Sequence, residues 1–122
     1  MKRLIIFLLL LVSVGFSQKT EYYQQFVSTD DYGNVEEINH YERKGDVIRY
    51  YKREIFYPNG QLKESWRYKD DKIHGPYIGY SYDGKKRLEG QFVDGKEDGL
   101  WKRVDNGRVV KKLRYKDGKE ID

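Results

Sequence analysis

The side chains best suited to acid–base or metal chemistry in this chain are two histidines and three pairs of neighbouring carboxylates in predicted turns. His40 and His74 stand far apart in the sequence, without the close ligand spacing of a zinc site. The pairs Asp30-Asp31, Asp70-Asp71 and Glu97-Asp98 could supply oxygen ligands to Ca²⁺, but their spacing matches neither an EF-hand loop nor a glycine–aspartate nonapeptide repeat. We therefore expect no metal site, a solvent-facing His40 and a His74 that shapes a turn.

The sequence also offers little support for nucleophilic or cofactor chemistry. The chain has no cysteine, which excludes disulfides, thiolate metal sites and cysteine nucleophiles. Ser65 and Ser81 have no histidine nearby in a nucleophile-like arrangement. The glycines precede predicted strands rather than helices, so no phosphate-binding loop is expected. The sequence predicts no catalytic residue, no cofactor and no enzymatic activity.

The elements that carry these residues follow a repeat of glycine and aromatic positions. Four glycines are each followed eight residues later by an aromatic residue; the pairs are Gly33 with Tyr41, Gly60 with Tyr68, Gly84 with Phe92 and Gly107 with Tyr115. In two units a second glycine precedes a further ring by two residues, Gly75 before Tyr77 and Gly99 before Trp101. Two full units and a final half unit share this register, which indicates an array of repeats.

Turn chemistry indicates that each unit is a β-hairpin. Asn or Asp precedes glycine in a pair that favours tight hairpin turns, and these glycines are Gly60, Gly84, Gly95, Gly107 and Gly118. The intervening segments are too short for a helix plus a strand. They predict strands near 21–28, 35–43, 46–57, 61–69, 76–82, 86–93, 99–105 and 108–116. Because short hairpin loops join antiparallel neighbours, we expect an all-β fold, an open antiparallel meander that is single-layered or elongated.

Alternation within the predicted strands separates an apolar face from a polar face. Counting back in twos from each ring gives a column of aromatic and aliphatic residues that includes Trp66, Leu88 and Leu113. The intervening positions are almost wholly polar, as at Arg87 and Lys112. We expect the rings to pack across strands and the polar face to meet water. The alternative is that the rings contact a ligand directly.

The first 17 residues differ from the rest of the chain. Two basic residues precede the apolar run 4–14, and Gly15 and Ser17 provide small residues at the positions that signal peptidase requires. We therefore expect a signal peptide over 1–17, cleaved before Gln18, with no transmembrane span in the mature protein. An uncleaved N-terminal anchor or a buried core helix is the alternative. Without cysteine the protein is not a lipoprotein, and we expect it in the periplasm or secreted.

The charge balance argues against a nucleic-acid partner. The formal net charge is +4, with 24 basic and 20 acidic residues. Removal of 1–17 would take away two basic residues and no acidic ones, which lowers the net charge to +2. A dedicated nucleic-acid binder would show a basic stripe and a larger excess of positive charge.

The combined spacing of glycine, aspartate and aromatic residues resembles the variant MORN repeat. The similarity is carried by 57–64, Tyr68 and 74–77, and it recurs over 83–101. One departure is Asp71, which stands where that repeat usually has a turn glycine.

The resemblance divides the chain into three parts and implies classes of function. After the signal peptide, 18–54 would be a degenerate N-terminal capping repeat and 55–122 the variant MORN-like hairpin repeats. The family implies association with membranes and protein scaffolds, and some of its members act as antitoxins of toxin–antitoxin systems.

Three functions follow as expectations. The first is an exported interaction protein that binds another protein in the cell envelope. The second is a binder of envelope carbohydrate or lipid headgroups through tyrosines, lysines and arginines. The third, from the resemblance alone, is an antitoxin-like or immunity-like partner.

The predicted strand 108–116 offers a candidate contact for a protein partner. It is the last long strand of the meander, so its edge is expected to be unpaired. The residues concerned are Lys111, Lys112, Leu113 and Arg114. Their charges could blunt the edge against aggregation, or the edge could accept a strand from an acidic partner.

Overall fold

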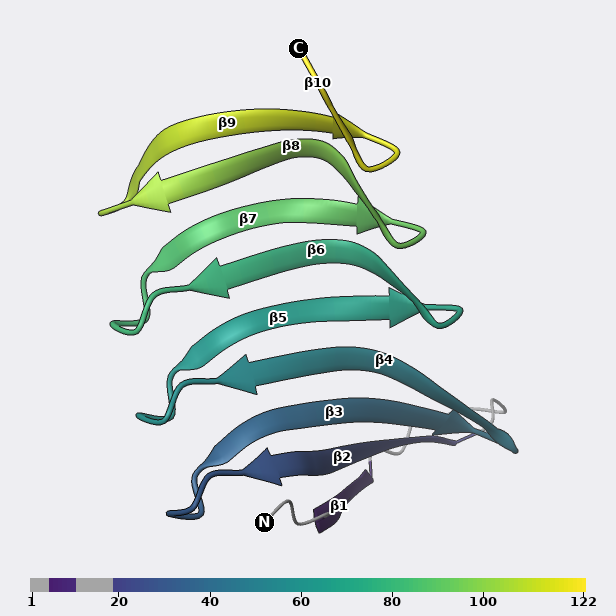
Figure 1. The fold of residues 1–122 in the computed structure, drawn as a ribbon. Coiled ribbons are helices and arrows are strands. Elements are labelled where there is room, and N and C mark those ends of the chain that lie inside the picture. Colours follow the sequence, from purple (N-terminus) through teal and green to yellow (C-terminus); the bar gives the residue numbers. More distant parts are fainter. Residues whose placement is uncertain (1–4, 11–18) are drawn as a thin grey trace.

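The computed structural model describes residues 5–10 and 19–122, which form one ten-stranded antiparallel sheet with its strands in chain order (Figure 1). The predicted all-β open meander is confirmed. The strands are β1 (Ile5–Leu10), β2 (Thr20–Thr29), β3 (Val35–Lys44), β4 (Val47–Phe56), β5 (Leu62–Lys69), β6 (Lys72–Tyr80), β7 (Lys86–Val93), β8 (Lys96–Asp105), β9 (Arg108–Lys116) and β10 (Lys119–Ile121).

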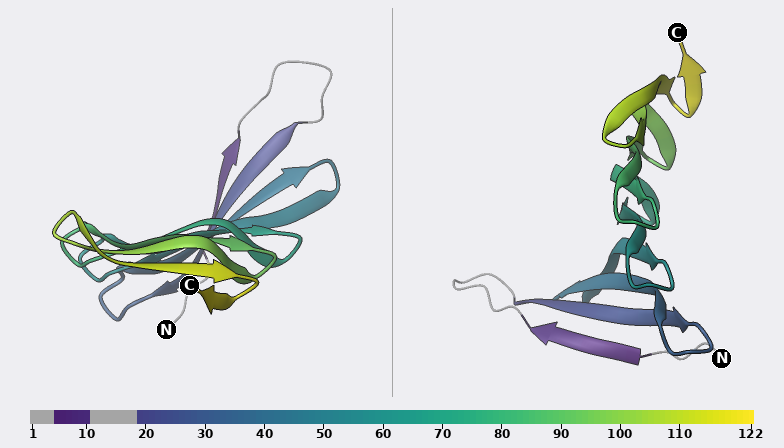
Figure 2. Two further views of the ribbon diagram at one scale, coloured as in Figure 1. Left: turned by 90° about the horizontal axis from the view of Figure 1, so that it is seen from above. Right: turned by 90° about the vertical axis from the view of Figure 1, so that its left-hand side faces the viewer.

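The sheet is a single layer. Figure 2 shows it from above and from the side, with no other described element covering either face. The strand direction turns steadily from β2–β4 to β7–β9, as expected of the natural twist of β-strands. The described residues contain no helix long and apolar enough to cross a membrane.

Eight predicted strands are present as β2–β9, but β6 and β8 begin earlier than expected, at Lys72 and Lys96. The cause is the two-residue turns before them. Asp70 and Asp71 have φ of 49° and 63°, and Asp94 also has positive φ, so the chain reverses at once and pairing resumes without a loop.

Gly75 and Gly99 lie inside β6 and β8 as β-bulges. Between the pairs Trp66↔Tyr77 and Tyr68↔Ile73 the register shifts, and it shifts again between Glu89↔Lys102 and Gln91↔Asp98. Gly75 and Gly99 have φ of 102° and 72°, a conformation that glycine adopts without steric cost.

Two strands were not expected. β10 pairs Lys119, Glu120 and Ile121 with the end of β9. β1 pairs with β2 from Ile5↔Phe26 to Leu10↔Glu21. β1 belongs to the segment predicted to be a signal peptide, and the predicted cleavage site before Gln18 lies outside the described residues, so cleavage stays a prediction.

Main-chain contacts hold successive units together at the turns. The Gly95 amide donates to the Ile73 carbonyl at 2.8 Å, and the Gly118 amide donates to the Glu97 carbonyl at 2.9 Å. At the opposite ends of the strands, the Tyr57 hydroxyl donates to the Tyr80 carbonyl at 2.8 Å. The turns at Gly95 and Gly118 therefore dock on the preceding unit, as in a repeat array whose members contact their neighbours.

The sheet has very little core. Among the described residues, Trp101 is the one apolar side chain that is buried, with 7% of its surface exposed. The buried polar residues are Ser28 and His40. Most of the sheet's other rings are only half-buried, so pairwise contacts between neighbouring strands supply the packing.

Candidate functional site

The most continuous surface feature is a column of aromatic rings on one face of the sheet, here called the ring face. It consists of Tyr41, Tyr50, Tyr68, Trp66, Tyr77, Phe92, Trp101 and Tyr115, contributed by β3 to β9. Neighbouring ring centroids lie between 4.4 Å (Tyr50–Tyr68) and 6.2 Å (Trp101–Tyr115), most of them tilted or edge-to-face. Contacts of this kind stabilise neighbouring strands beyond simple burial.

Several polar atoms of the ring face are satisfied within the chain. The Trp66 Nε1 donates to the Tyr68 hydroxyl at 2.7 Å, and the Tyr50 hydroxyl donates to the Asn39 Oδ1 at 2.7 Å. The Tyr77 hydroxyl donates to the Glu64 Oε1 at 2.9 Å. Burial, followed by this bond to Glu64, raises the pKa of Tyr77 to about 12. Tyr50, Trp66, Tyr68 and Tyr77 are therefore held in the sheet by hydrogen bonds as well as by ring contacts.

Trp101 is the anchor of the column, and its position depends on Gly90. A methyl group at Gly90 would lie 2.1 Å from Cδ2 of Trp101 and 2.3 Å from its Cε2. The indole therefore lies directly on the β7 backbone. The Phe92 and Tyr77 rings, on the same face of the sheet, contact the indole at centroid distances of 5.1 and 5.5 Å.

One cation is embedded in the ring face. Arg53 of β4 lies with its guanidinium 5.2 Å from the centroid of Trp66 and its Nε 2.7 Å from the Glu37 Oε1. Arg53 thus combines a cation–π contact with an ion pair across β3, β4 and β5. The alternation pattern did not single out Arg53, because it was counted in the predicted strands that end on Tyr68, Phe92 and Tyr115, and 46–57 was not among them.

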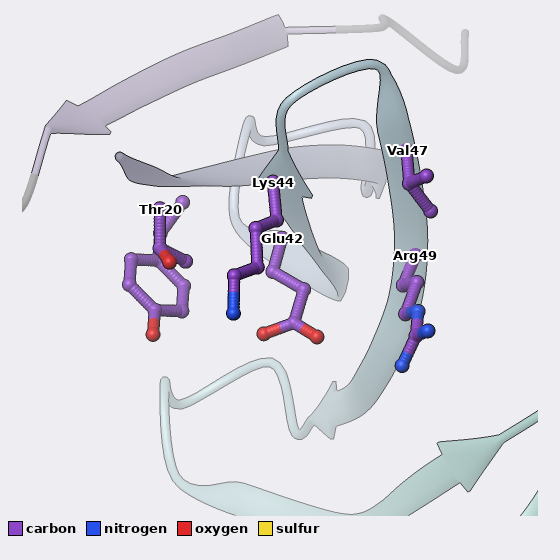
Figure 3. Close-up of a pocket in the computed structure, with 6 residues that line it drawn as sticks. Thr20, Glu42, Lys44, Val47 and Arg49 are labelled. Carbon is purple, nitrogen blue, oxygen red and sulfur yellow. The ribbon is translucent and has the colours of Figure 1, made fainter. Parts of the chain in front are cut away.

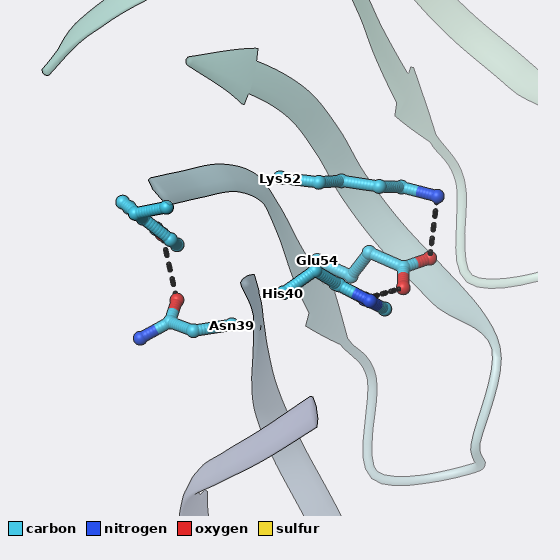
Figure 4. Close-up of polar contacts among 5 residues, drawn as sticks. Asn39, His40, Lys52 and Glu54 are labelled. Carbon is cyan, nitrogen blue, oxygen red and sulfur yellow. Dashed lines mark hydrogen bonds and ion pairs between the residues drawn. The ribbon is translucent and has the colours of Figure 1, made fainter. Parts of the chain in front are cut away.

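A second polar cluster lies on the opposite face of β3 and β4. His40 Nε2 is 2.5 Å from the Glu54 Oε1, and the Lys52 Nζ is 3.8 Å from the Glu54 Oε2 (Figure 4). The hydrogen bond with His40 holds the pKa of Glu54 below its ordinary value despite burial. The Tyr51 ring lies 6.1 Å from the His40 ring.

The expectation of a solvent-facing His40 is therefore wrong, since only 6% of its surface is exposed. The polar-face assignment holds, but the register of β3 and β4 brings Glu54 and Tyr51 against the imidazole. His74 is closer to its expected role of shaping a turn. Its Nδ1 accepts a hydrogen bond from the Asp94 amide at 3.3 Å, so His74 caps the turn of the following unit.

Several open hollows lie on the described part of the sheet. Figure 3 shows one of about 370 Å³ between β2, β3 and β4, lined by Thr20, Tyr22, Glu42, Lys44, Val47 and Arg49. The Glu42 carboxylate lies between Lys44 and Arg49, and no histidine lines this hollow. Within the described residues no group of three or more histidines and carboxylates could hold a metal ion.

The structure places the predicted repeat residues in two kinds of position, the ring column and the turns and bulges. Tyr68, Tyr77, Phe92, Trp101 and Tyr115 meet in the ring column. The predicted glycines, which are Gly60, Gly75, Gly84, Gly95, Gly99, Gly107 and Gly118, all have positive φ between 72° and 102°. They lie in turns and bulges and form no common site.

The predicted partner edge is only partly open. β10 pairs Ile121 with Arg114 and covers the end of β9, which the sequence did not indicate. No described strand pairs with the outer side of Lys111, Lys112 or Leu113.

No protein-family model matches the chain, and no curated protein or solved structure matches it either.

Proposed function

We propose that the chain is an exported, non-enzymatic interaction protein whose sheet binds another protein in the cell envelope. The observation that carries the proposal is the single-layer sheet, in which no element of the described residues covers the half-buried rings of the ring face. Soluble proteins rarely leave a contiguous apolar surface uncovered, and such surfaces mark contacts with partners. A sheet with Trp101 as its one buried apolar residue among those described would gain stability when a partner covers the remaining rings.

The geometry supports a protein partner better than a sugar. Carbohydrate binding uses ring faces together with free polar groups that bond sugar hydroxyls. Here Tyr50, Tyr68 and Tyr77 already exchange hydrogen bonds with their neighbours, and several rings present an edge to the next ring. A broad, half-apolar surface with a polar rim suits a protein–protein contact.

Export is proposed from the N-terminal sequence. Cleavage before Gln18 would also remove β1 and expose the outer edge of β2, because β1 pairs along β2. N-terminal sequencing of the protein from an envelope fraction is expected to begin at Gln18. A main pool in the cytoplasm that begins at Met1 would contradict export.

Site-specific photo-crosslinking in the producing cells tests the binding function. A photoreactive phenylalanine derivative replaces Tyr68 or Tyr115 on the ring face, and in a matched control it replaces Tyr32, a turn residue that is 92% exposed. We expect the ring-face positions to give an adduct with one defined protein and the Tyr32 position to give none. Equal labelling at all three positions, or no adduct with correctly exported protein, would contradict the proposal.

A further inference from the structure

The strand β9 has an unusual charge distribution. Its nine residues, Arg108–Lys116, include five basic residues and no acidic residue. The neighbouring strand β8 adds Lys102 and Arg103 at its centre. The result is a local excess of positive charge in a chain whose overall charge is nearly balanced.

These cations stand directly opposite one another. Lys102 pairs with Lys112 on one face of the sheet, and Arg103 pairs with Lys111 on the ring face. Like charges at paired positions destabilise a sheet. Among the described residues, Lys102 reaches one carboxylate, Glu89, at 4.0 Å, and Arg103, Lys111 and Lys112 have no ion pair. The arrangement therefore works against the folded sheet unless negative charge comes from elsewhere.

The same residues border an open main-chain edge. β10 pairs only with Arg114–Lys116, and along 108–113 no described strand occupies the outer side of β9. Val109 and Val110 on this edge are 45% and 58% exposed. Basic residues on an edge strand can serve solely to prevent aggregation. That purpose does not explain Lys102, because β8 is an interior strand.

We propose that the outer edge of β9 accepts an extended acidic segment of a protein partner as an additional strand. This inference rests on the proposed function and names the chemistry of the partner. Main-chain hydrogen bonds along 108–113 would provide affinity for any strand. Acidic side chains at alternate positions lie next to Lys112 and Arg114, on the face where Lys102 adds positive charge from the inner neighbour of β9, and the apolar side chains between them lie beside Leu113 on the ring face.

Peptide binding tests the two components separately. The probe is a fluorescent peptide of alternating Val and Glu, compared with Val-Gln and Val-Lys peptides and with Val-Glu peptides that carry N-methyl groups on either set of alternate amides. We expect the Val-Glu peptide to bind and the Val-Lys peptide not to bind. One N-methylated peptide should bind at least about tenfold more weakly, because its main-chain donors are blocked.

The variant Lys112→Glu separates binding from folding. It replaces a repulsive pair with an attractive one opposite Lys102, so its urea midpoint should be equal to or higher than that of the wild type. Its affinity for the Val-Glu peptide should fall about tenfold at 0.01 M salt and less at 0.15 M, where charges are screened. The control Lys85→Glu changes the net charge equally, in the turn between β6 and β7, and should bind as the wild type does.

The outcomes distinguish this inference from the proposed function. Val-Glu binding that ignores both N-methylation patterns would show a general polyanion surface and overturn the strand-addition mechanism. A wild-type protein that binds none of the peptides would overturn the β9 proposal, and ring-face photo-crosslinks would then leave the interaction function standing. Weaker peptide binding by Lys112→Glu, together with a weaker cellular crosslink in that variant, would support both.

Discussion

Replacement of Gly90 by alanine is expected to be among the most damaging single-atom additions to this sheet. Its methyl group would lie 2.1 Å from Cδ2, 2.3 Å from Cε2 and 2.5 Å from Cε3 of Trp101. These distances are too short for non-bonded carbon atoms. The neighbour is a rigid indole rather than the end of a flexible side chain. Trp101 must therefore leave its place on β7, or the two strands must separate.

The magnitude follows from what Trp101 would lose. Its ring contacts Tyr77, Phe92 and Tyr115, and each such aromatic pair contributes about 0.5–1.5 kcal/mol. Removal of a buried tryptophan costs about 3–5 kcal/mol, which sets the upper limit, and overpacking that the sheet absorbs costs about 1–3 kcal/mol. We expect Gly90→Ala to lower the free energy of unfolding by about 2–4 kcal/mol.

Urea denaturation followed by far-ultraviolet circular dichroism measures this loss, and Gly79→Ala is the matched control. A methyl group at Gly79 would meet Tyr77, Leu88 and Arg87 at 3.4 Å or more, so the control should stay within about 0.5 kcal/mol of the wild type. In a Trp101→Ala background, Gly90→Ala should have almost no further effect. Equal losses in both backgrounds would refute the steric argument.

Three further predictions concern a turn, a buried pair and the two faces. Asp71→Gly should raise the free energy of unfolding by about 0.5 kcal/mol in urea melts, because Asp71 has φ of 63° and glycine relieves that strain; a loss would contradict the turn assignment. The pKa of Glu54 is lowered from 4.5, so its stabilising effect is complete above that value and disappears as the pH falls through the lowered pKa. Acid denaturation should therefore be shallower in Glu54→Gln, and an unchanged profile would contradict the pairing with His40. Phe92→Ala should cost about 2 kcal/mol because its ring is half-buried, whereas Arg87→Ala should stay within about 0.5 kcal/mol; equal losses would show that the two faces are assigned wrongly.

The repeated hairpins were predictable from sequence because their determinants are local. An Asn-Gly or Asp-Gly pair marks a turn: Asp94-Gly95 forms a two-residue turn with both φ positive, and Asn59-Gly60 lies in a longer turn in which Gly60 alone of the two has positive φ. Rings such as Phe92 and Tyr115 stand at constant distances from those turns, so their shared face follows from alternation alone.

The buried His40 and the Gly90–Trp101 contact could not be predicted in the same way. His40 meets Glu54 because the register of β3 and β4 shifts between His40↔Lys52 and Tyr41↔Tyr50, and the local pattern shows no sign of this bulge. The contact at Gly90 depends on the corresponding shift at Gly99 between β7 and β8. Both features arise from pairing between strands, where a shift of one residue changes which side chains meet.

Amide hydrogen exchange with and without the Val-Glu peptide tests most directly whether β9 holds a partner strand. If it does, amides of 108–113 that lack a partner in the free protein should exchange more slowly in the complex, while those of β5 and β6, which are already paired on both sides, should not change. Protection elsewhere in the sheet with unchanged exchange along 108–113 would contradict strand addition at β9.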